Sequence, residues 1–329
     1  GETDQRMSPR VGPLLREVAR LPGDGYNPSA VSVFHQLVVR ALPLMPRALV
    51  WRVARRYVAG TTLEDAVRTV RELNEKGMMA TVDVLGEEVD EPERAEAFLE
   101  EYVRVYETIE AEGLDANVSV KPTMLGLVID RDLCHRSLER LAEVAAARDN
   151  FLRIDMEDRR TTRATLEIYR SLQARFGAVG TVLQAYMRRT LRDIEELPAE
   201  GANIRLCKGI YIEPRSVAWK GYETVRLNFL RALQALLDRE IYVGIATHDE
   251  FLLCGAEAEI RRRGLSRNEF EYQMLLGVEE ELRDVLVGAG HRLRVYVPYG
   301  RDWYAYSSRR LRENPRIAGH VIRSFLRGS

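Results

Sequence analysis

Polar residues that could do chemistry recur in this sequence at one kind of position, the end of a short apolar, β-branched run. Polar side chains at the end of a buried strand are costly unless they are paired or used. The residues at these positions are Lys121, Asp155, Glu157, Gln184, Arg205, Lys208, Thr247, His248, Asp249, Gln273 and Tyr296. One or two could be structural ion pairs, but seven runs that all end this way are hard to explain by packing alone.

The acidic and basic residues near positions 121 and 155 allow several interpretations. Lys121, beside Pro122, could be a Schiff-base nucleophile, an anion-binding group or the ion-pair partner of Asp155. Asp155 and Glu157 are two residues apart, so both point to the same face of an extended strand. They could bind a metal or act as general acid and base, although neither pattern is specific by itself.

A second group of candidates follows two later runs. Arg205 is followed by Lys208 and Gly209, and a cation next to a glycine, where backbone approaches closely, suits a phosphate group. Thr247 and His248 form a polar pair at another run end. A lone histidine is more often a structural hydrogen-bonding group than a base, so His248 adds little evidence.

Near the C-terminus, a helical pattern carries Tyr306, Arg309, Arg310 and Glu313. Offsets of three and four place these residues on one helix face. Two interpretations stay open, a solvated ion-pair face or a clamp for a carboxylate, which the planar fork of arginine binds in a bidentate manner.

The elements that must position these residues alternate along the chain. Eight short apolar runs are separated by amphipathic stretches, several of which end in Gly as a helix C-cap does. The predicted strands are 78–86, 117–123, 151–157, 179–186, 203–209, 241–249, 270–277 and 293–300. This count predicts an α/β fold, a (β/α)8 TIM-type barrel, whose chemistry lies at the carboxyl ends of the strands. A doubly wound open sheet could alternate similarly, but no GxGxxG follows any of these runs.

The predicted domain organisation has three parts. Residues 1–27 are expected to be a flexible tail or an expression remnant, 28–76 to form N-terminal helices, and 77–329 to form the catalytic barrel with its C-terminal helix. Arginines interrupt the apolar face of the segment 28–59, which favours helices packed over one end of a larger domain and leaves a membrane-surface helix as the alternative.

Composition excludes several classes of protein. A net charge of -1 and a pI of about 6.6 argue against a nucleic-acid binder. The 3 cysteines have no CxxC spacing and the 5 histidines no HExxH, so we expect neither a disulfide framework nor a metal site. Because we find no membrane-length apolar run and no signal peptide, we expect a cytoplasmic protein, with peripheral contact at the inner membrane left open.

Several motifs together resemble the flavin-dependent proline dehydrogenases, and most closely the short monofunctional bacterial enzymes. The motifs are IDMED, RLCKG, ATHD, FEYQMLLG, YVPYGRDWYAY and YSSRRLRENP, and the resemblance runs from about Tyr57 to the C-terminus. It implies a (β/α)8 barrel that binds FAD noncovalently and oxidises proline to 1-pyrroline-5-carboxylate, with the electrons passed to a quinone.

The resemblance also implies roles for individual residues. The catalytic pair falls on Asp155 and Arg205. The contacts to FAD fall on Met156, Gln184, Arg205, Lys208, Gly209, Ile210, Thr247 and His248. The substrate site falls on Lys121, Tyr211, Leu275, Tyr296, Arg309, Arg310 and Glu313.

Two positions depart from the family pattern. Ile210 stands where the family usually has Ala, and Cys207 where Val is common. Bulk at Ile210 could narrow the pocket or tilt the flavin ring, which leaves the preferred substrate open. Two other functions remain as alternatives, a Schiff-base lyase of the aldolase type that uses Lys121 and a non-catalytic flavin- or metabolite-binding barrel. The sequence does not predict the oligomeric state.

Overall fold

The computed structural model describes residues 47–86, 88–198 and 200–313. The chain divides into two compact units. One is Ala59–Gly300, and the other comprises residues 1–58 and 301–329, of which 47–58 and 301–313 are described. The predicted limits of the tail and of the N-terminal helices fall partly outside these residues and stay predictions.

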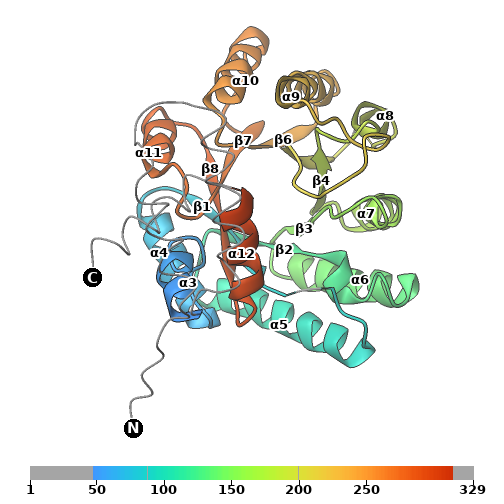
Figure 1. Ribbon diagram of the computed structural model, residues 1–329, viewed down its shortest axis with the longest axis vertical. Helices are drawn as coiled ribbons and strands as arrows, with labels where there is room; N and C mark the ends of the chain where they lie inside the picture. The colour runs from blue at the N-terminus through green and yellow to red at the C-terminus, as the bar shows by residue number, and fades with distance from the viewer. Residues whose placement is uncertain (1–46, 87, 199, 314–329) are drawn as a thin grey trace, which may run out of the picture. The chain divides into compact units, whose positions relative to one another are not determined.

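The larger unit is a closed barrel of eight parallel strands in sequence order. Figure 1 shows these strands in the middle of a ring of helices. The strands are β1 (Met79–Val84), β2 (Ala116–Val120), β3 (Leu152–Ile154), β4 (Val179–Gln184), β5 (Asn203–Cys207), β6 (Tyr242–Ala246), β7 (Phe270–Leu275) and β8 (Leu293–Tyr299). The predicted (β/α)8 fold is therefore confirmed. Each predicted strand overlaps an observed one, although several predicted runs extend two or three residues past the observed end.

Amphipathic helices cover the outside of the barrel, because each has one buried apolar face that must pack against the strands. They are α4 (Leu63–Glu75), α5 (Pro92–Ala111), α6 (Arg131–Ala146), α7 (Thr162–Phe176), α8 (Thr190–Glu195), α9 (Tyr222–Leu237), α10 (Glu250–Arg263) and α11 (Glu280–Gly288), with the short 3-10 turn η2 (Pro122–Leu125) after β2. A capping box starts α4: the Thr62 hydroxyl accepts from the Asp65 N–H, and the Asp65 carboxylate accepts from the Thr62 N–H. This helix packs against β1 and β8 and so belongs to the barrel unit.

The two faces of the strands differ in chemistry. Apolar, mostly β-branched residues such as Val118, Ile154 and Val243 belong to the core between strands and helices. Alternate residues point into the barrel, where polar groups meet; for example, Thr81 on β1 donates to Asn117 on β2. In the parallel register Thr81 also pairs with Tyr296, so β1 and β8 close the barrel. The carboxyl ends of all eight strands consequently surround one opening.

The second unit, within its described residues, contains the helices α3 (Arg47–Ala54) and α12 (Trp303–Glu313). The two helices pack together, with the Trp51 and Trp303 ring centroids 4.6 Å apart. The helix predicted near the C-terminus is thus confirmed.

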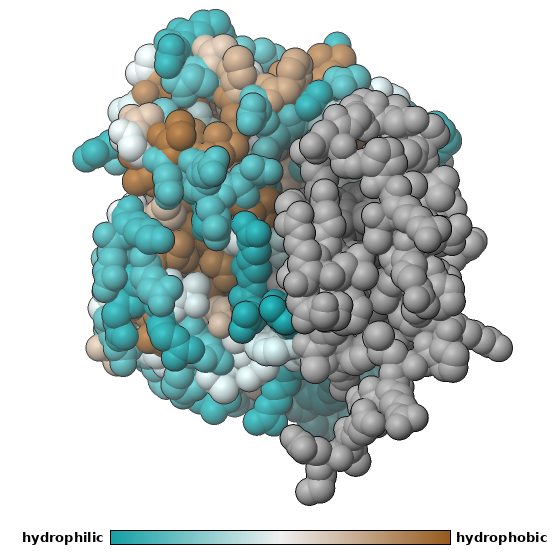
Figure 2. Space-filling model, turned by 60° about the vertical axis from the view of Figure 1, so that its left-hand side comes forward, coloured by the Kyte–Doolittle hydropathy of each residue, from teal (hydrophilic) through white to brown (hydrophobic). Residues whose placement is uncertain are grey.

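The surface has the mixed character of an ordinary globular protein. The face in Figure 2 is mostly hydrophilic, with apolar residues gathered mainly in its upper half. No helix in the described part of the chain is both long enough and apolar enough to cross a membrane.

Candidate active site

Arg205, on β5, lies at the centre of a polar cluster inside the barrel. Its Nη1 donates to Asp155 Oδ1 at 2.7 Å and to Ser119 Oγ at 3.2 Å, and its Nε donates to Gln273 Oε1 at 2.5 Å. Ser119 Oγ donates to the same Asp155 oxygen at 2.6 Å, and the Tyr296 hydroxyl reaches the other oxygen at 3.3 Å. Asp155 and Arg205, predicted as the catalytic pair, are therefore in direct contact.

Lys121 has a different partner from the one proposed on sequence grounds. Its Nζ donates to Asp83 on β1, at 2.6 and 2.7 Å from the two carboxylate oxygens, whereas Asp155 pairs with Arg205. Of the three interpretations of Lys121, the ion pair with Asp155 is therefore wrong. Burial opposes the charged ammonium, but the negative charges of Asp83 and Asp155 outweigh this effect and raise the pKa of Lys121.

The carboxylates of Asp155 and Glu157 have different partners, and both residues lie after the end of β3 at Ile154. Glu157 instead turns to Thr123, whose backbone N–H and hydroxyl donate to its oxygens at 2.9 and 2.6 Å. Burial raises the pKa of Glu157, although both bonds from Thr123 oppose this. These contacts favour a structural role for Glu157. Among the described residues, no group of three His, Cys, Asp or Glu could hold a metal ion.

Lys208 belongs to a second charged cluster, centred on Asp249. Lys208 Nζ lies 3.2 Å from Asp249 Oδ2, which also accepts from Tyr222 Oη and Arg226 Nε, both at 2.9 Å. Arg226 Nη2 donates to the other Asp249 oxygen at 2.7 Å. Burial would raise the pKa of Asp249, but the bonds from Arg226, Tyr222 and Lys208 hold it well below its ordinary value. Two cations are thus fixed by one carboxylate.

Tyr222 and Arg226 were missed by the sequence analysis, because they lie on α9 and not at a strand end. The only sequence signal is their spacing of four, which places them on one helix face. The Arg226 guanidinium lies 4.3 Å from the Tyr222 ring centroid and 4.8 Å from that of Phe251. Tyr222 and Phe251 are both more than half exposed. Cations and apolar surface therefore meet here.

The glycine after Lys208 is required by a close approach. Gly209 has a φ of 101°, and a Cβ added there would lie 2.2 Å from Cδ1 of Tyr186. Tyr211 packs against the small apolar cluster around Tyr186, whereas Ile210 is 44% exposed.

The remaining predicted cofactor residues are held by hydrogen bonds or packing. His248 Nε2 accepts from the Leu275 N–H at 2.9 Å, so a neutral His248 carries its proton on Nδ1. Thr247 Oγ1 accepts from the Asp249 N–H, and Gln184 Nε2 donates to the Glu157 carbonyl. Met156 is buried in the main core.

The predicted carboxylate clamp cannot be followed to its side chains. Arg309, Arg310 and Glu313 lie on α12, but their side chains fall outside the described residues. Tyr306 on the same helix is buried. The clamp stays a prediction.

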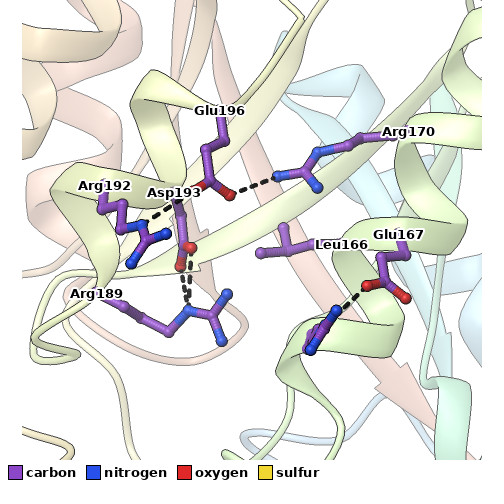
Figure 3. A pocket seen from close by; sticks show the side chains of 8 residues that line it. Leu166, Glu167, Arg170, Arg189, Arg192, Asp193 and Glu196 are labelled. Atoms are coloured by element: carbon purple, nitrogen blue, oxygen red, sulfur yellow. Dashed lines mark hydrogen bonds and ion pairs between the residues drawn. The ribbon is translucent and has the colours of Figure 1, made fainter.

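A surface pocket of about 530 Å3 lies between α7 and α8, on the outside of the barrel (Figure 3). Its arginines are each paired with a carboxylate, as Arg189 with Asp193 and Arg170 with Glu196. None of the predicted site residues lines it, so we do not assign it to the reaction.

Comparison with known proteins decides the family. The family model described as proline dehydrogenase matches residues 66–323. The chain belongs to the proline dehydrogenase family. It is 37% identical to proline dehydrogenase from Deinococcus radiodurans, over 86% of this chain and 93% of that one, and 36% identical to proline dehydrogenase 1 from Bacillus subtilis, over 83% and 91%. The resemblance drawn from the motifs is confirmed.

A solved structure supports the fold of this proline dehydrogenase family member independently. The crystal structure of proline utilization A from Bdellovibrio bacteriovorus, inactivated by N-propargylglycine, superposes with a TM-score of 0.78 over 93% of this chain. The match spans 40% of that longer protein at 20% identity, so it shows the fold alone.

Proposed function

We propose that this chain oxidises L-proline to 1-pyrroline-5-carboxylate with FAD as its cofactor and passes the electrons to a quinone. The observation that carries this proposal is the contact between Arg205 and Asp155 at the carboxyl ends of the strands, in a chain of the proline dehydrogenase family. Asp155 would hold the guanidinium of Arg205 in place. A fixed cation at this place would favour negative charge that develops during a hydride transfer.

The residues present fit FAD. Nε and Nη1 of Arg205 are engaged, while its Nη2 has no hydrogen-bond partner within the described part of the chain and is available to a flavin. Lys208 and Arg226 would hold the phosphates, and the exposed Tyr222 and Phe251 rings offer surface for an aromatic base. When bound, FAD supplies the acceptor for the hydride. Met156, Gln184, Gly209, Ile210, Thr247 and His248 complete the proposed contacts.

The substrate would lie against Lys121 and Tyr296. Because the pKa of Lys121 is raised, its ammonium is charged at neutral pH and suits the carboxylate of proline. The same charge disfavours the lyase alternative, in which a neutral Lys121 must attack a carbonyl. We propose Tyr211 and Leu275 as further contacts, with Arg309, Arg310 and Glu313 on α12 as the carboxylate clamp.

The quinone acceptor and peripheral contact with the inner membrane of a cytoplasmic protein rest on the family resemblance alone. We propose them together, because a lipid-soluble acceptor must be reached at a membrane. Reoxidation of the reduced protein by a water-soluble quinone analogue, compared with oxygen, tests the acceptor.

The function is tested by flavin spectroscopy on the purified chain. Bound FAD should give the flavin absorption bands, and L-proline added without oxygen should bleach them, whereas D-proline should not. N-propargylglycine should inactivate this chain as it does the Bdellovibrio protein. A protein that does not retain FAD would refute the proposal.

Two further results would support the alternatives. A yellow protein that no cyclic amino acid reduces would support the non-catalytic barrel. Trapping of a carbonyl substrate on Lys121 by borohydride would support the lyase.

A further inference from the structure

A continuous chain of hydrogen bonds crosses the barrel interior and ends at Arg205. Arg294 on β8 donates to Glu271 on β7 through Nε and Nη2, at 2.7 and 3.1 Å. Gln273 Nε2 donates to Glu271 Oε1 at 2.6 Å, and Gln273 Oε1 accepts from Arg205 Nε at 2.5 Å. The Tyr242 hydroxyl adds a bond to Glu271 at 3.1 Å. All members of the chain other than Tyr242 are buried.

The direction of the Gln273 amide in this chain is fixed by chemistry. The pKa of Glu271 is lowered to about 2, because the charge and hydrogen bonds of Arg294 outweigh the effect of burial. An ionised carboxylate only accepts hydrogen bonds, so Gln273 must turn its NH2 group toward Glu271. Its oxygen then faces Arg205, which has only donors.

The neighbouring strand leaves room for this amide. Gly244 on β6 lies beside Gln273, and a Cβ added there would be 2.4 Å from Gln273 Nε2. Since the φ of Gly244 does not lie in the left-handed region, this close approach explains why a glycine stands here. The structure therefore accommodates the amide in one place and one orientation.

We propose that Glu271 and Gln273 are positioning residues, which hold the guanidinium of Arg205 so that its Nη2 points to the flavin. This inference rests on the proposed function. Asp155 and Ser119 hold only Nη1, and a guanidinium fixed at one nitrogen can still rotate. The bond from Nε to Gln273 supplies the second fixed point.

The test compares two substitutions of Gln273 that separate positioning from packing. Gln273→Met fills a similar volume but cannot accept from Arg205, whereas Gln273→Glu keeps an acceptor oxygen. A packing role predicts that Met is tolerated better than Glu, because a buried carboxylate beside Glu271 is costly. Positioning predicts the reverse order in the rate of flavin reduction at saturating L-proline, with the KM for proline little changed.

We expect the reduction rate of Gln273→Met to fall about 10–100-fold, as loss of one charge-assisted hydrogen bond implies, with Gln273→Glu intermediate. Gln234→Met is the matched control. Gln234 Nε2 also donates to a glutamate, Glu259 Oε1 at 2.7 Å, but this bond joins helices α9 and α10 on the outside of the barrel. This control should keep the parent rate.

A second readout separates this inference from the proposed function. The midpoint potential of the bound FAD, titrated with dithionite, does not depend on proline being the substrate. It should become more negative in Gln273→Met, because a misplaced Arg205 stabilises the reduced flavin less. If proline does not reduce the FAD bound to the parent chain, the proposed function fails. The difference in midpoint potential between the parent and Gln273→Met still tests the positioning role.

An unchanged potential and rate in Gln273→Met would overturn the positioning role, as would a Met variant faster than the Glu variant. Should Gln273→Met fail to fold, the smaller Gln273→Leu, which also lacks an acceptor for Arg205, takes its place in both measurements, and an unchanged potential and rate in that variant would overturn the positioning role.

Discussion

Removing Asp83 should separate the structural from the chemical contribution of the Lys121 ion pair. Asp83 is fully buried, and Lys121 is 18% exposed in its side chain. Asp83→Asn preserves the shape of the side chain but deletes the charge that Nζ contacts at 2.6 and 2.7 Å. Lys121 is then left with the more distant charge of Asp155.

The magnitude follows from the burial of the pair. Removing one partner of a buried ion pair costs about 3–5 kcal/mol, because the other charge stays buried without compensation. The partial exposure of Lys121 and the charge of Asp155 place the expected loss near ~3 kcal/mol. For a unit of about 240 residues, a loss of this size lowers the melting temperature by about 6–12 °C.

The assay is thermal unfolding of the single variant and of the double variant Asp83→Asn/Lys121→Met. Because the double variant contains no unpaired charge, it should melt above the single variant. A single variant that melts like the parent, or a double variant that melts lower than the single, would refute this reasoning.

The same substitution has a consequence for the pH dependence. Burial raises the pKa of Asp83, and the charges of Asp83 and Asp155 raise the pKa of Lys121 against the effect of burial, so the ion pair exists between these two pKa values. At the upper limit, the contribution of the Lys121 charge is complete below the unfolded pKa of lysine and is lost as pH rises through the folded value. In Asp83→Asn the pKa of Lys121 falls, since burial is less opposed. The KM for proline should therefore begin to rise at a lower pH than in the parent.

Three other predictions concern single sites. Arg310→Lys keeps the charge but loses the planar fork, so kcat/KM for proline should fall about tens- to hundreds-fold at normal flavin content, and parent-like turnover would assign this arginine to a surface ion-pair face. Glu271→Gln should lower the free energy of unfolding by about 3 kcal/mol near neutral pH. Since the folded pKa of Glu271 is lowered to about 2, the difference in melting temperature between parent and variant should disappear as pH falls from about 4.5 toward 2, and a difference that stays constant would contradict this. Gly209→Ala should lower the melting temperature more than Gly264→Ala. Both glycines have positive φ, but only at position 209 does the added Cβ meet Tyr186. Equal losses would show that the Tyr186 ring moves aside at little cost.

The barrel could be predicted from the sequence because its signal is local. Each strand is a short β-branched run and each helix an amphipathic stretch, so the order of elements follows without knowledge of contacts. The strand ends were less certain. The run 151–157 was assigned wholly to a strand, but β3 ends at Ile154. The Asp155 N–H still donates to the Val120 carbonyl of β2 at 2.9 Å, and the side chains of Asp155 and Glu157 then bond to separate partners.

The partners within the site could not be predicted in the same way, because they depend on positions around a closed barrel. Asp83 lies in an apolar run of β1 and pairs in register with Ser119, two residues before Lys121. A single acidic residue within the run MMATVDVLG was the available signal, but nothing local tells which of several cations it meets. Arg226 was missed for a related reason, since the sequence does not show which residue of α9 reaches Asp249.

The closure of the barrel by β1 and β8 has a consequence for how the chain reaches its native state. Thr81 and Tyr296, which pair across this seam, are 215 positions apart (296 − 81). Contacts of such long range form late, because the loop entropy must be overcome before they contribute. A nascent chain in which β8 has not yet been synthesised also lacks Arg294, so Glu271 has no ion-pair partner on β8. In such a chain β1 and β7 are unpaired sheet edges. We therefore expect incomplete chains to aggregate or to bind chaperones until the eighth strand is available, and the polar interior to become ordered only when the seam closes.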